Sequence, residues 1–380
     1  MITLAQLAED PHPHLARLRG TAPVVWLAAL GGWMVTSRAQ ALAVMRDAET
    51  FTVDDPRFTT ARITGPSMLS VDGAEHARHR DPFTDPFRPA AARDSFADTV
   101  RHETDRLLDG LEGRGEAELR REFAGPLAAR TMARALGLDG VPVDRVLRWY
   151  EAIVMSVHEL TEGRPAGAEG PAAYAALREA VAATVDAGSP RSLLVTAARD
   201  LDLPDLAANA AVLLFGGIET TESMITNLLS HLLHAPRRLA ELRAEPELLD
   251  NAIEESLRLE PAAAVVDRYA TRDVRLAGAD IHRGDLVTVS LAAANRDPDV
   301  FPDPDRFDLR RPNSRQHLAF AHGPHYCLGA HLARLETRIA LRSCLDRLDG
   351  LRPDSDRPSA VRGLVFRKPP ALWARWDRRH

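Results

Sequence analysis

A cysteine in a glycine-containing loop is the residue of this chain best suited to chemistry. Cys327 lies in the stretch FAHGPHYCLG, which also holds Phe320, Gly323, His325 and Gly329. The thiolate is the metal-binding form of cysteine, and it is favoured where free backbone N–H groups and the positive end of a helix dipole point at the sulfur. Glycine has no Cβ and lets a flat macrocycle lie close to the backbone. The stretch therefore suits a thiolate ligand to haem iron.

The segment after this cysteine must supply the helix whose first turn faces the sulfur. Its apolar residues recur at a spacing that gathers them on one helix face and directs that face toward a core. They are Leu328, Leu332, Leu335, Ile339, Leu345 and Leu348. We therefore predict a helix over residues 328–348, in which Cys344 is a core residue.

Two other interpretations of the loop are open at this point. A single cysteine is most often a small buried apolar residue. Zinc is the second alternative, because His322, His325 and His331 surround Cys327 and are plausible ligand types. Their spacing lacks the paired, loop-separated ligands of structural zinc sites, and no second cysteine lies nearby. The rest of the chain must decide among the three.

The stretch resembles the haem-binding loop of the cytochrome P450 superfamily, whose pattern is Phe, two residues, Gly, one, Arg or His, one, Cys, one, Gly. Every fixed position matches. The resemblance implies haem b (iron protoporphyrin IX) bound by Phe320, His325, Cys327 and Gly329, with the Cys327 thiolate as metal ligand. Thiolate ligation pushes electron density onto iron and favours O–O cleavage.

A second match lies in PELLDNAIEESLRLEP, a predicted helix bounded by prolines. Residues three apart share a helix face, so Glu255 and Arg258 can form an ion pair, which by itself is common on solvated faces. Glu254, four residues before Arg258, is an alternative partner. The resemblance implies that Glu255, Arg258 and Arg306 form a buried structural network.

A third match lies in a long helical pattern over residues 204–236. Two glycines in its middle cost roughly 1 kcal/mol each relative to Ala, so something should justify them. Gly216, Gly217, Glu219 and Thr220 are similar to the distal-helix pattern of the family, which often has Ala first. That helix crosses the haem face, and the resemblance implies that Gly217 adjoins the cofactor and that Glu219 and Thr220 deliver protons to a dry pocket. Without this context, Glu-Thr-Thr in a helix would indicate a solvated face.

A fourth match concerns the two haem propionates, whose charge needs hydrogen-bond donors. His76 and Arg80 in EHARHR are four residues apart and share a helix face, although so short a basic run is usually surface. The resemblance implies that they hold the propionates together with Arg268 and His325. Residues 71–73 depart from the Asp-Pro-Pro that often precedes this histidine in the family, which leaves the start of the helix open.

Composition is compatible with one large α-rich α+β protein. The chain has 380 residues, and no Gly/Ser linker, repeat or low-complexity tract divides it. We expect a single cytochrome P450 domain over residues 1–380, mainly helical, with strands near residues 24–35 and 285–290 in a small β-rich region. The net charge of −6 gives no electrostatic support for a nucleic-acid partner.

The cellular location is inferred from three patterns in the sequence. The apolar run in residues 24–35 is far shorter than the roughly twenty residues needed to span a membrane, and a strand hairpin is the better interpretation. No signal-peptide pattern is evident, and two cysteines give no disulfide framework. We expect a cytoplasmic bacterial monomer with no membrane partner.

The combined matches are typical of an oxidoreductase, a class I type bacterial haem-thiolate monooxygenase. The resemblance implies dioxygen as co-substrate and electrons from a ferredoxin and its reductase, with Arg78, His331 and Arg334 as candidate contacts. The pocket walls are expected to be mainly apolar, which indicates a small, largely apolar substrate, as in secondary metabolism. We expect those walls in residues 58–69, 155–160, 213–220, 262–266 and 363–366. Oxidative coupling, desaturation or peroxide-driven oxidation on the same scaffold is an alternative, and a non-catalytic haem carrier or sensor is another.

Overall fold

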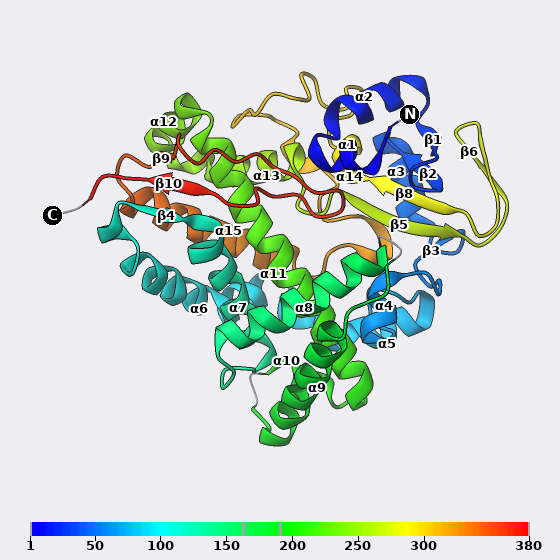
Figure 1. Cartoon of the computed structure of the whole chain (residues 1–380), viewed down its shortest axis with the longest axis horizontal. Helices are drawn as coiled ribbons and strands as arrows, with labels where there is room; N and C mark the ends of the chain where they lie inside the picture. The colour runs from blue at the N-terminus through cyan, green and yellow to red at the C-terminus, as the bar shows by residue number, and fades with distance from the viewer. Residues whose placement is uncertain (1, 162–163, 190–191, 379–380) are drawn as a thin grey trace. The chain divides into compact units, whose positions relative to one another are not determined.

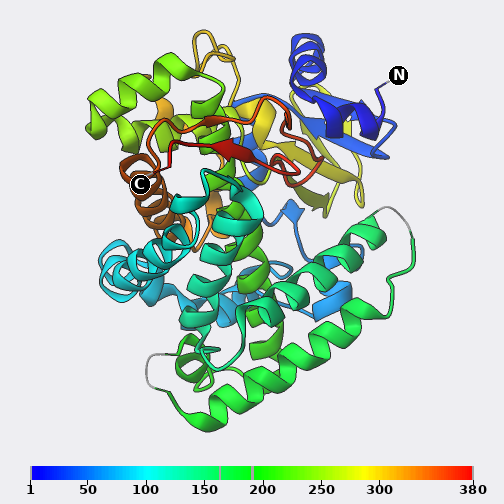
Figure 2. The same ribbon diagram turned by 60° about the vertical axis from the view of Figure 1, so that its left-hand side comes forward.

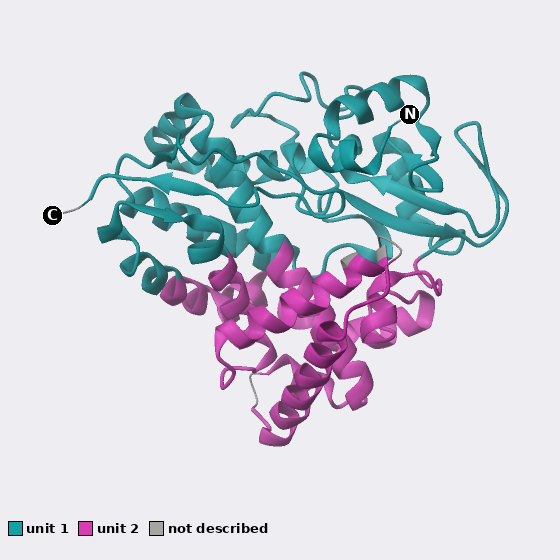
Figure 3. Ribbon diagram, in the orientation of Figure 1, with its two compact units in different colours: residues 1–52, 104–124, 220–380 teal, residues 53–103, 125–219 magenta. Residues whose placement is uncertain are grey.

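The computed structural model describes residues 2–161, 164–189 and 192–378 (Figure 1). These residues form two compact units, coloured separately in Figure 3. Unit 1 comprises residues 1–52, 104–124 and 220–380, and unit 2 comprises residues 53–103 and 125–219. The chain passes repeatedly from one unit to the other, which agrees with the lack of a linker sequence. The expected single domain remains a prediction.

Unit 2 is helical throughout its regular elements. Helices α8 and α9 are long and pack side by side, and α4 packs against both (Figures 1 and 2). Helix α7 packs against α8 and buries most of its residues. The helices are α4 (Thr59–Thr64), α5 (Gly73–Thr84), α7 (Gly125–Leu136), α8 (Val143–Thr161), α9 (Glu169–Ala187) and α10 (Leu193–Ala197), with a short 3-10 turn, η1 (Asp85–Phe87).

Unit 1 contains the β structure. Its largest sheet has the strand order β1-β2-β8-β5-β3, in which β1 and β2 form the expected hairpin and β2 runs parallel to β8. The alternation of this sheet buries Val35, Val287 and Val289 completely in one core cluster. The strands are β1 (Val24–Leu27), β2 (Gly32–Val35), β3 (Phe51–Thr52), β5 (Val265–Ala270) and β8 (Leu286–Ser290). The strands predicted near residues 24–35 and 285–290 are thus confirmed.

Two smaller sheets and a set of helices complete unit 1. Strand β10 (Trp373–Arg375) pairs with β4 (Glu116–Glu118) and β9 (Arg352–Pro353), and β6 (Val274–Leu276) pairs with β7 (Ala279–Ile281). The α-helices are α1 (Leu4–Glu9), α2 (His12–Thr21), α3 (Arg38–Arg46), α12 (Pro236–Ala244), α13 (Leu249–Leu259), α14 (Leu291–Ala294) and α15 (Ala330–Arg347). The short turns are η2 (Glu112–Arg114), the π-turn η3 (Arg120–Ala124), η4 (Pro246–Leu248), η5 (Ser314–Gln316) and η6 (Gly323–His325).

Two helices, α6 (Pro89–Asp109) and α11 (Leu203–Leu233), contribute residues to both units. Helix α11 is the longest, and the prolines at its borders set its ends, because Pro204 lies in the first turn and Pro236 begins the next helix. The helix-rich architecture agrees with the predicted fold class. No helix among the described residues combines the length and apolar character needed to cross a membrane.

Candidate functional site

The cysteine loop has the predicted relation to its helix. Turn η6 comes directly before Tyr326 and Cys327, and α15 begins three residues after the cysteine, with Gly329 as its N-cap. The backbone N–H of Cys327 donates to the carbonyl oxygen of Phe320 over 2.9 Å, which closes the loop. The Cys327 side chain is partly buried. A thiolate here would face the amino end of α15, which favours its charge.

The two glycines of the loop have different roles. Gly323 has φ +75°, and a Cβ at this position would clash with the carbonyl oxygen of Met45 in α3. Gly323 is therefore required for the loop to pack on its own unit. Gly329 has φ −82°, and no heavy atom lies within 4 Å of the place where its Cβ would be. This open backbone beside Cys327 fits a flat macrocycle, so the chemistry and the shape of the loop both suit a haem.

Charged residues behind the loop fix its conformation. The guanidinium of Arg334 lies 4.4 Å from the centroid of the Phe320 ring and donates from Nε to Oε1 of Glu254 over 2.6 Å. His317 Nε2 lies 3.0 Å from Oε2 of the same carboxylate. Burial alone would raise the pKa of Glu254, but these hydrogen bonds outweigh it and lower the pKa to about 2. The Glu254 carboxylate thus binds Arg334 and His317, and it is Glu255 that pairs with Arg258.

The predicted Glu255–Arg258 pair is completely buried. Arg258 donates from Nε to Oε2 of Glu255 over 2.7 Å and from an Nη to Oε1 over 2.9 Å, a bidentate arrangement. A buried pair is stable only when its remaining groups are also hydrogen-bonded. Arg258 meets this requirement with the carbonyl oxygens of Asn295 and Pro304.

The prediction of Arg306 as the third cation of this network was wrong. Arg311 donates from Nε to Oε1 of Glu255 over 2.9 Å and is 6% exposed. The Arg306 side chain is 56% exposed and lies 3.7 Å from Asp308. Arg306 contributes only its carbonyl oxygen, which accepts hydrogen bonds from Arg258 and Arg311. In this irregular segment, the side chain of Arg311 reaches Glu255, whereas Arg306 contributes only its backbone carbonyl oxygen to the network.

The middle of α11 carries the predicted acid and threonine. Glu219 is 5% exposed in unit 2 and accepts a hydrogen bond from the phenol of Tyr150 in α8. Thr220, the next residue of the helix, is partly buried in unit 1. Sequence reasoning missed Tyr150, which no motif marks.

The two glycines before this acid also differ. A Cβ at Gly217 would clash with Sδ of Met132 in α7, so this glycine allows the two helices of unit 2 to approach closely. A Cβ at Gly216 would have no heavy atom within 4 Å. The open side of α11 is therefore at Gly216, while the predicted contact of Gly217 with the cofactor remains a prediction.

The helix expected to hold the propionates is α5, which begins at Gly73 with φ +63°. The departure at residues 71–73 has a local reason, because the Asp72 carboxylate accepts a hydrogen bond from the backbone N–H of Val53 over 2.9 Å. His76 is buried, and Arg80 is partly buried one helical turn later. Both lie on one face of α5, as the spacing predicts.

A buried polar cluster anchors α5 within unit 2. Asn209 of α11 donates from Nδ2 to Nδ1 of His79 over 2.8 Å, and its Oδ1 accepts the backbone N–H of Met68 over 2.9 Å. An amide nitrogen can only donate, so Nδ1 of His79 is the acceptor. Burial lowers the pKa of His79, which keeps the ring neutral. The cluster joins α5 to the wall segment of residues 58–69, and no motif in the sequence indicates it.

The remaining cofactor candidates lie in unit 1. Arg268 in β5 is 4% exposed, and an Nη donates to the carbonyl oxygen of Asp267 over 2.7 Å. His325 is partly buried in η6. Cys344 is completely buried, and burial raises the pKa of its thiol, so it is the inert core residue that was predicted. Within the described part of the chain, no group of three His, Cys, Asp or Glu residues could hold a metal ion, so the geometry does not support zinc.

Elements that carry several of the predicted pocket-wall segments contact one another within each unit. In unit 2, α4 lies in residues 58–69 and packs against α8, which carries residues 155–160. In unit 1, the backbone N–H of Ala264 donates to the carbonyl oxygen of Val365 over 2.8 Å, and Ala263 forms a β-bridge with Phe366. Residues 262–266 and 363–366 are thus neighbours.

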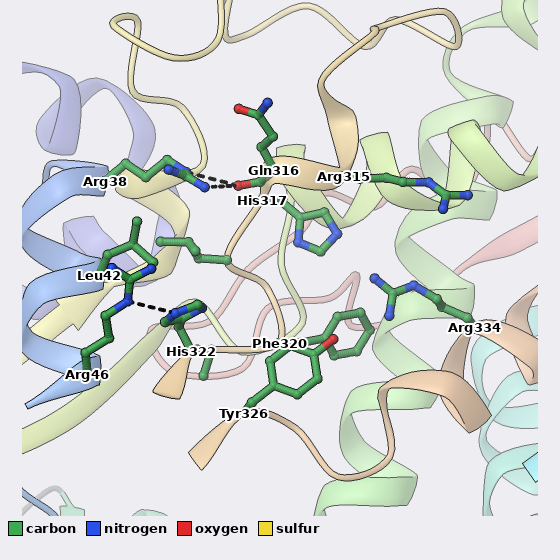
Figure 4. Close-up of a pocket in the computed structure, with 12 residues that line it drawn as sticks. Arg38, Leu42, Arg46, Arg315, Gln316, His317, Phe320, His322, Tyr326 and Arg334 are labelled. Carbon is green, nitrogen blue, oxygen red and sulfur yellow. Dashed lines mark hydrogen bonds between the residues drawn. The ribbon is translucent and has the colours of Figure 1, made fainter. Parts of the chain in front are cut away.

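A basic hollow lies between α3, η5 and the cysteine loop, all in unit 1 (Figure 4). Its volume is about 360 Å³. We define it by its arginines, Arg38, Arg46, Arg315 and Arg334, and among the described residues that line it none is acidic. Arg46 donates from Nε to Nε2 of His322 over 2.9 Å, and burial and the nearby arginines lower the pKa of that histidine. The hollow is therefore cationic without depending on histidine charge.

Comparison with known proteins agrees with this geometry. The family described as cytochrome P450 matches residues 191–374. The cytochrome P450 monooxygenase PikC of Streptomyces venezuelae is 34% identical over an alignment that covers 98% of this chain and 92% of that protein. The mycinamicin IV hydroxylase/epoxidase of Micromonospora griseorubida is 33% identical, with 90% of this chain and 89% of that protein covered.

A solved structure is similar over nearly the whole chain. It is that of the cytochrome P450 enzyme CxnD for C–S bond formation in chuangxinmycin biosynthesis. The two share 29% sequence identity with a TM-score of 0.87, and the match covers 99% of this chain and 97% of that chain. At this identity and coverage, the likeness extends beyond the cysteine loop to the complete fold.

Proposed function

The chain belongs to the cytochrome P450 family of haem-thiolate monooxygenases, and from this premise we propose that it hydroxylates or otherwise oxidises a small, largely apolar molecule in bacterial secondary metabolism. The observation that carries the proposal is the position of Cys327 three residues before α15, beside the open backbone of Gly329. The acid and threonine of α11 support it. PikC and the mycinamicin hydroxylase/epoxidase are relatives of the expected reaction class.

The residues available to hold haem b are the ones that the resemblance to the family indicates. Cys327 would ligate iron from the loop before α15. His76 and Arg80 on α5, with Arg268 and His325, offer the donors that two propionates require. When bound, the haem would supply dioxygen activation, and the thiolate's electron donation would favour O–O cleavage.

The chain's own contribution to the chemistry is proton delivery. Glu219 is buried, and we propose that it supplies a proton that is relayed to the Thr220 hydroxyl, which passes its own proton on, while Glu219 regains one from water. Thr220 would orient that proton toward the distal face. The apolar wall segments would exclude bulk water, so that protons arrive only through this pair.

We propose that electrons come from a small acidic protein of the ferredoxin type, with its reductase, and that the basic hollow contributes to its docking. Of the contacts expected from sequence, Arg78 is engaged by Glu75 at 2.9 Å and by Asp205 at 2.7 Å, and Arg334 by Glu254. His331 is exposed. Arg46 and Arg315 of the hollow therefore extend the candidate surface (Figure 4).

Charge reversal tests this docking surface. We expect Arg315→Glu to slow electron transfer from a plant-type ferredoxin about tenfold at low ionic strength and less at high salt, because steering between charged surfaces is screened. Arg275→Glu makes the same charge change on the exposed strand β6 and should leave the rate unchanged. Equal rates for both variants would exclude the hollow from docking.

The alternative with a specific observation in its favour is oxidative bond formation on the same scaffold. CxnD, whose structure is similar to that of this chain, serves C–S bond formation. A non-catalytic haem carrier or sensor is the other alternative. We further propose a cytoplasmic location, which suits a chain in which Cys327 and Cys344 are not joined in a disulfide.

Turnover separates these functions. Purified protein should be screened with small apolar compounds for a change in the haem absorption spectrum, and every binder incubated with dioxygen, NADPH, ferredoxin and reductase. A product heavier by one oxygen atom supports monooxygenation, and a product with a new bond but no added oxygen supports coupling. Binding without NADPH consumption by any compound would favour the carrier or sensor.

A further inference from the structure

The phenol of Tyr150 and the carboxylate of Glu219 form a buried hydrogen bond between α8 and α11, inside unit 2. Tyr150 is 7% exposed and Glu219 is 5% exposed. An ionised carboxylate is costly to bury unless hydrogen bonds compensate its charge. The phenol O–H donates to Oε2, so Tyr150 satisfies an acceptor of the buried carboxylate and fixes the direction in which the carboxylate points.

The surroundings of Tyr150 restrict it to this role. The buried residues on its own helix face are Val146 and Ile153, one turn away on either side, and Trp149 lies beside it. Helix α7 packs against α8 and, through Met132, against Gly217 of α11. Tyr150 is thus shielded from solvent, in surroundings where a hydrogen bond is stronger than in water.

The neutrality of the phenol matters for proton transfer. A lysine or arginine in this place would stabilise the carboxylate about twice as strongly through a charge-assisted hydrogen bond and would hold it ionised. A phenol is a neutral donor, so it hydrogen-bonds to Glu219 without placing a fixed positive charge beside the carboxyl group.

We propose that Tyr150 is a positioning residue for proton delivery, acting through Glu219. When Glu219 gives up its proton toward the Thr220 hydroxyl, that hydroxyl passes its own proton on to the reacting oxygen and is restored. The resulting Glu219 carboxylate accepts the Tyr150 hydrogen bond until it takes up a proton from water. Tyr150 itself keeps its proton throughout. The proposal rests on the proposed role of Glu219, and it assigns to α8 a part in the chemistry besides forming the pocket wall.

The test is a double-mutant cycle with Tyr150→Phe, Glu219→Gln and the double variant. Each holoprotein is supplied with plant-type ferredoxin, its reductase, NADPH and dioxygen, without organic substrate. The fractions of electrons released as hydrogen peroxide and as water are measured in H2O and D2O. Water formation requires additional protons, so it reports on their delivery. We expect Tyr150→Phe to lower the rate of water formation about fivefold, a part of the 10²–10⁴ that general acid catalysis contributes, and to raise the solvent isotope effect.

The double variant distinguishes the two levels of the proposal. If Tyr150 acts through Glu219, Tyr150→Phe has no further effect when Glu219 is already replaced by glutamine. A change in Glu219→Gln without a change in Tyr150→Phe overturns the positioning role and leaves the proposed function intact. No change in Glu219→Gln contradicts the proposed proton role of the acid itself. Independent effects that multiply in the double variant would also overturn the proposal.

Two further measurements guard against a purely structural explanation. Tyr174→Phe removes another phenol hydroxyl of unit 2, which donates to the backbone carbonyl oxygen of Thr64 over 2.7 Å, and should not change the isotope effect. Urea unfolding of the apoproteins should show that Tyr150→Phe lowers the midpoint in the native background and lowers it less in the Glu219→Gln background. If Tyr150→Phe does not fold, Glu219→Asp is the substitute variant, because its shorter side chain moves the carboxylate away from the phenol of Tyr150. An unchanged rate of water formation in Glu219→Asp would overturn the proposal.

Discussion

Arg311 donates a hydrogen bond from Nε to Oε1 of Glu255 over 2.9 Å, although the two residues lie 56 positions apart. It fastens the irregular segment before the cysteine loop to α13. The Glu255 carboxylate also binds Arg258, so two guanidiniums share one buried acid. The network therefore fixes the position of the segment that precedes the cysteine loop through hydrogen bonds to α13.

This relationship predicts unequal effects of two neighbouring arginines. Arg311→Ala leaves the buried Glu255 with one cation fewer and should lower the free energy of unfolding by about 3 kcal/mol. Arg306→Ala removes only an exposed side chain and should change it by less than about 0.5 kcal/mol, because its carbonyl oxygen stays in the network. Urea unfolding and haem content measure both. Equal losses for the two variants would contradict the corrected assignment.

The Glu254 carboxylate predicts an acid-sensitive stability. Burial alone would raise the pKa of Glu254, but hydrogen bonds from Arg334 and His317 lower it to about 2, from an ordinary 4.5. Its stabilising contribution is complete above pH 4.5 and is lost as the pH falls from 4.5 toward 2, by about 3 kcal/mol in total. Urea unfolding across this range measures the loss. Glu254→Gln should flatten this part of the profile, and an unchanged slope would show that another group titrates.

The two loop glycines predict different defects. Gly323→Ala forces a Cβ against the Met45 carbonyl at positive φ and should destabilise even the apoprotein, by about 1–3 kcal/mol. Gly329→Ala meets no protein atom, so the unfolding free energy of the apoprotein should change by less than about 0.5 kcal/mol. Its haem content should fall, because the added methyl occupies the macrocycle's face. Full haem content in Gly329→Ala would place the haem elsewhere.

Thr220 predicts a loss of coupling. Thr220→Ala removes the hydroxyl that, in our proposal, relays the proton of Glu219. A larger share of electrons should therefore be released as hydrogen peroxide, with product per NADPH falling about tenfold. The ratio of product and peroxide to NADPH consumed is the measurement. Thr221→Ala removes a buried hydroxyl one position along α11 and is the matched control. Unchanged product yield in Thr220→Ala would argue for coupling or peroxide-driven chemistry.

Much of this site could be predicted from sequence because its residues lie in regular elements. The prolines around α11 and α13 and the apolar stripe of α15 indicate where these helices begin and end, and helix geometry then fixes which residues share a face. Spacing alone left both Glu254 and Glu255 as partners of Arg258; the resemblance to the family favoured Glu255, and the structure confirms that pair.

The wrong or missing predictions concern irregular segments and contacts between distant helices, where no sequence periodicity indicates which side chains meet. Arg306 and Arg311 have the same charge in one irregular segment, and no rule of spacing says which guanidinium turns inward. Tyr150 and Asn209 form contacts between helices that are distant in sequence, and such contacts depend on helix rotation and packing. The resemblance places Gly217 beside the cofactor, which stays a prediction; the close contact with Met132 that the structure shows at this glycine could not be predicted from the sequence.

The central claim is that Cys327 ligates haem iron as a thiolate, and the absorption spectrum of the reduced protein under carbon monoxide tests it most directly. We predict a Soret band at the long-wavelength position characteristic of thiolate-ligated haem, lost in Cys327→Ala and retained in Cys344→Ala. A carbonyl band of the histidine-ligated type, or a thiolate-type band that persists in Cys327→Ala, would contradict the account.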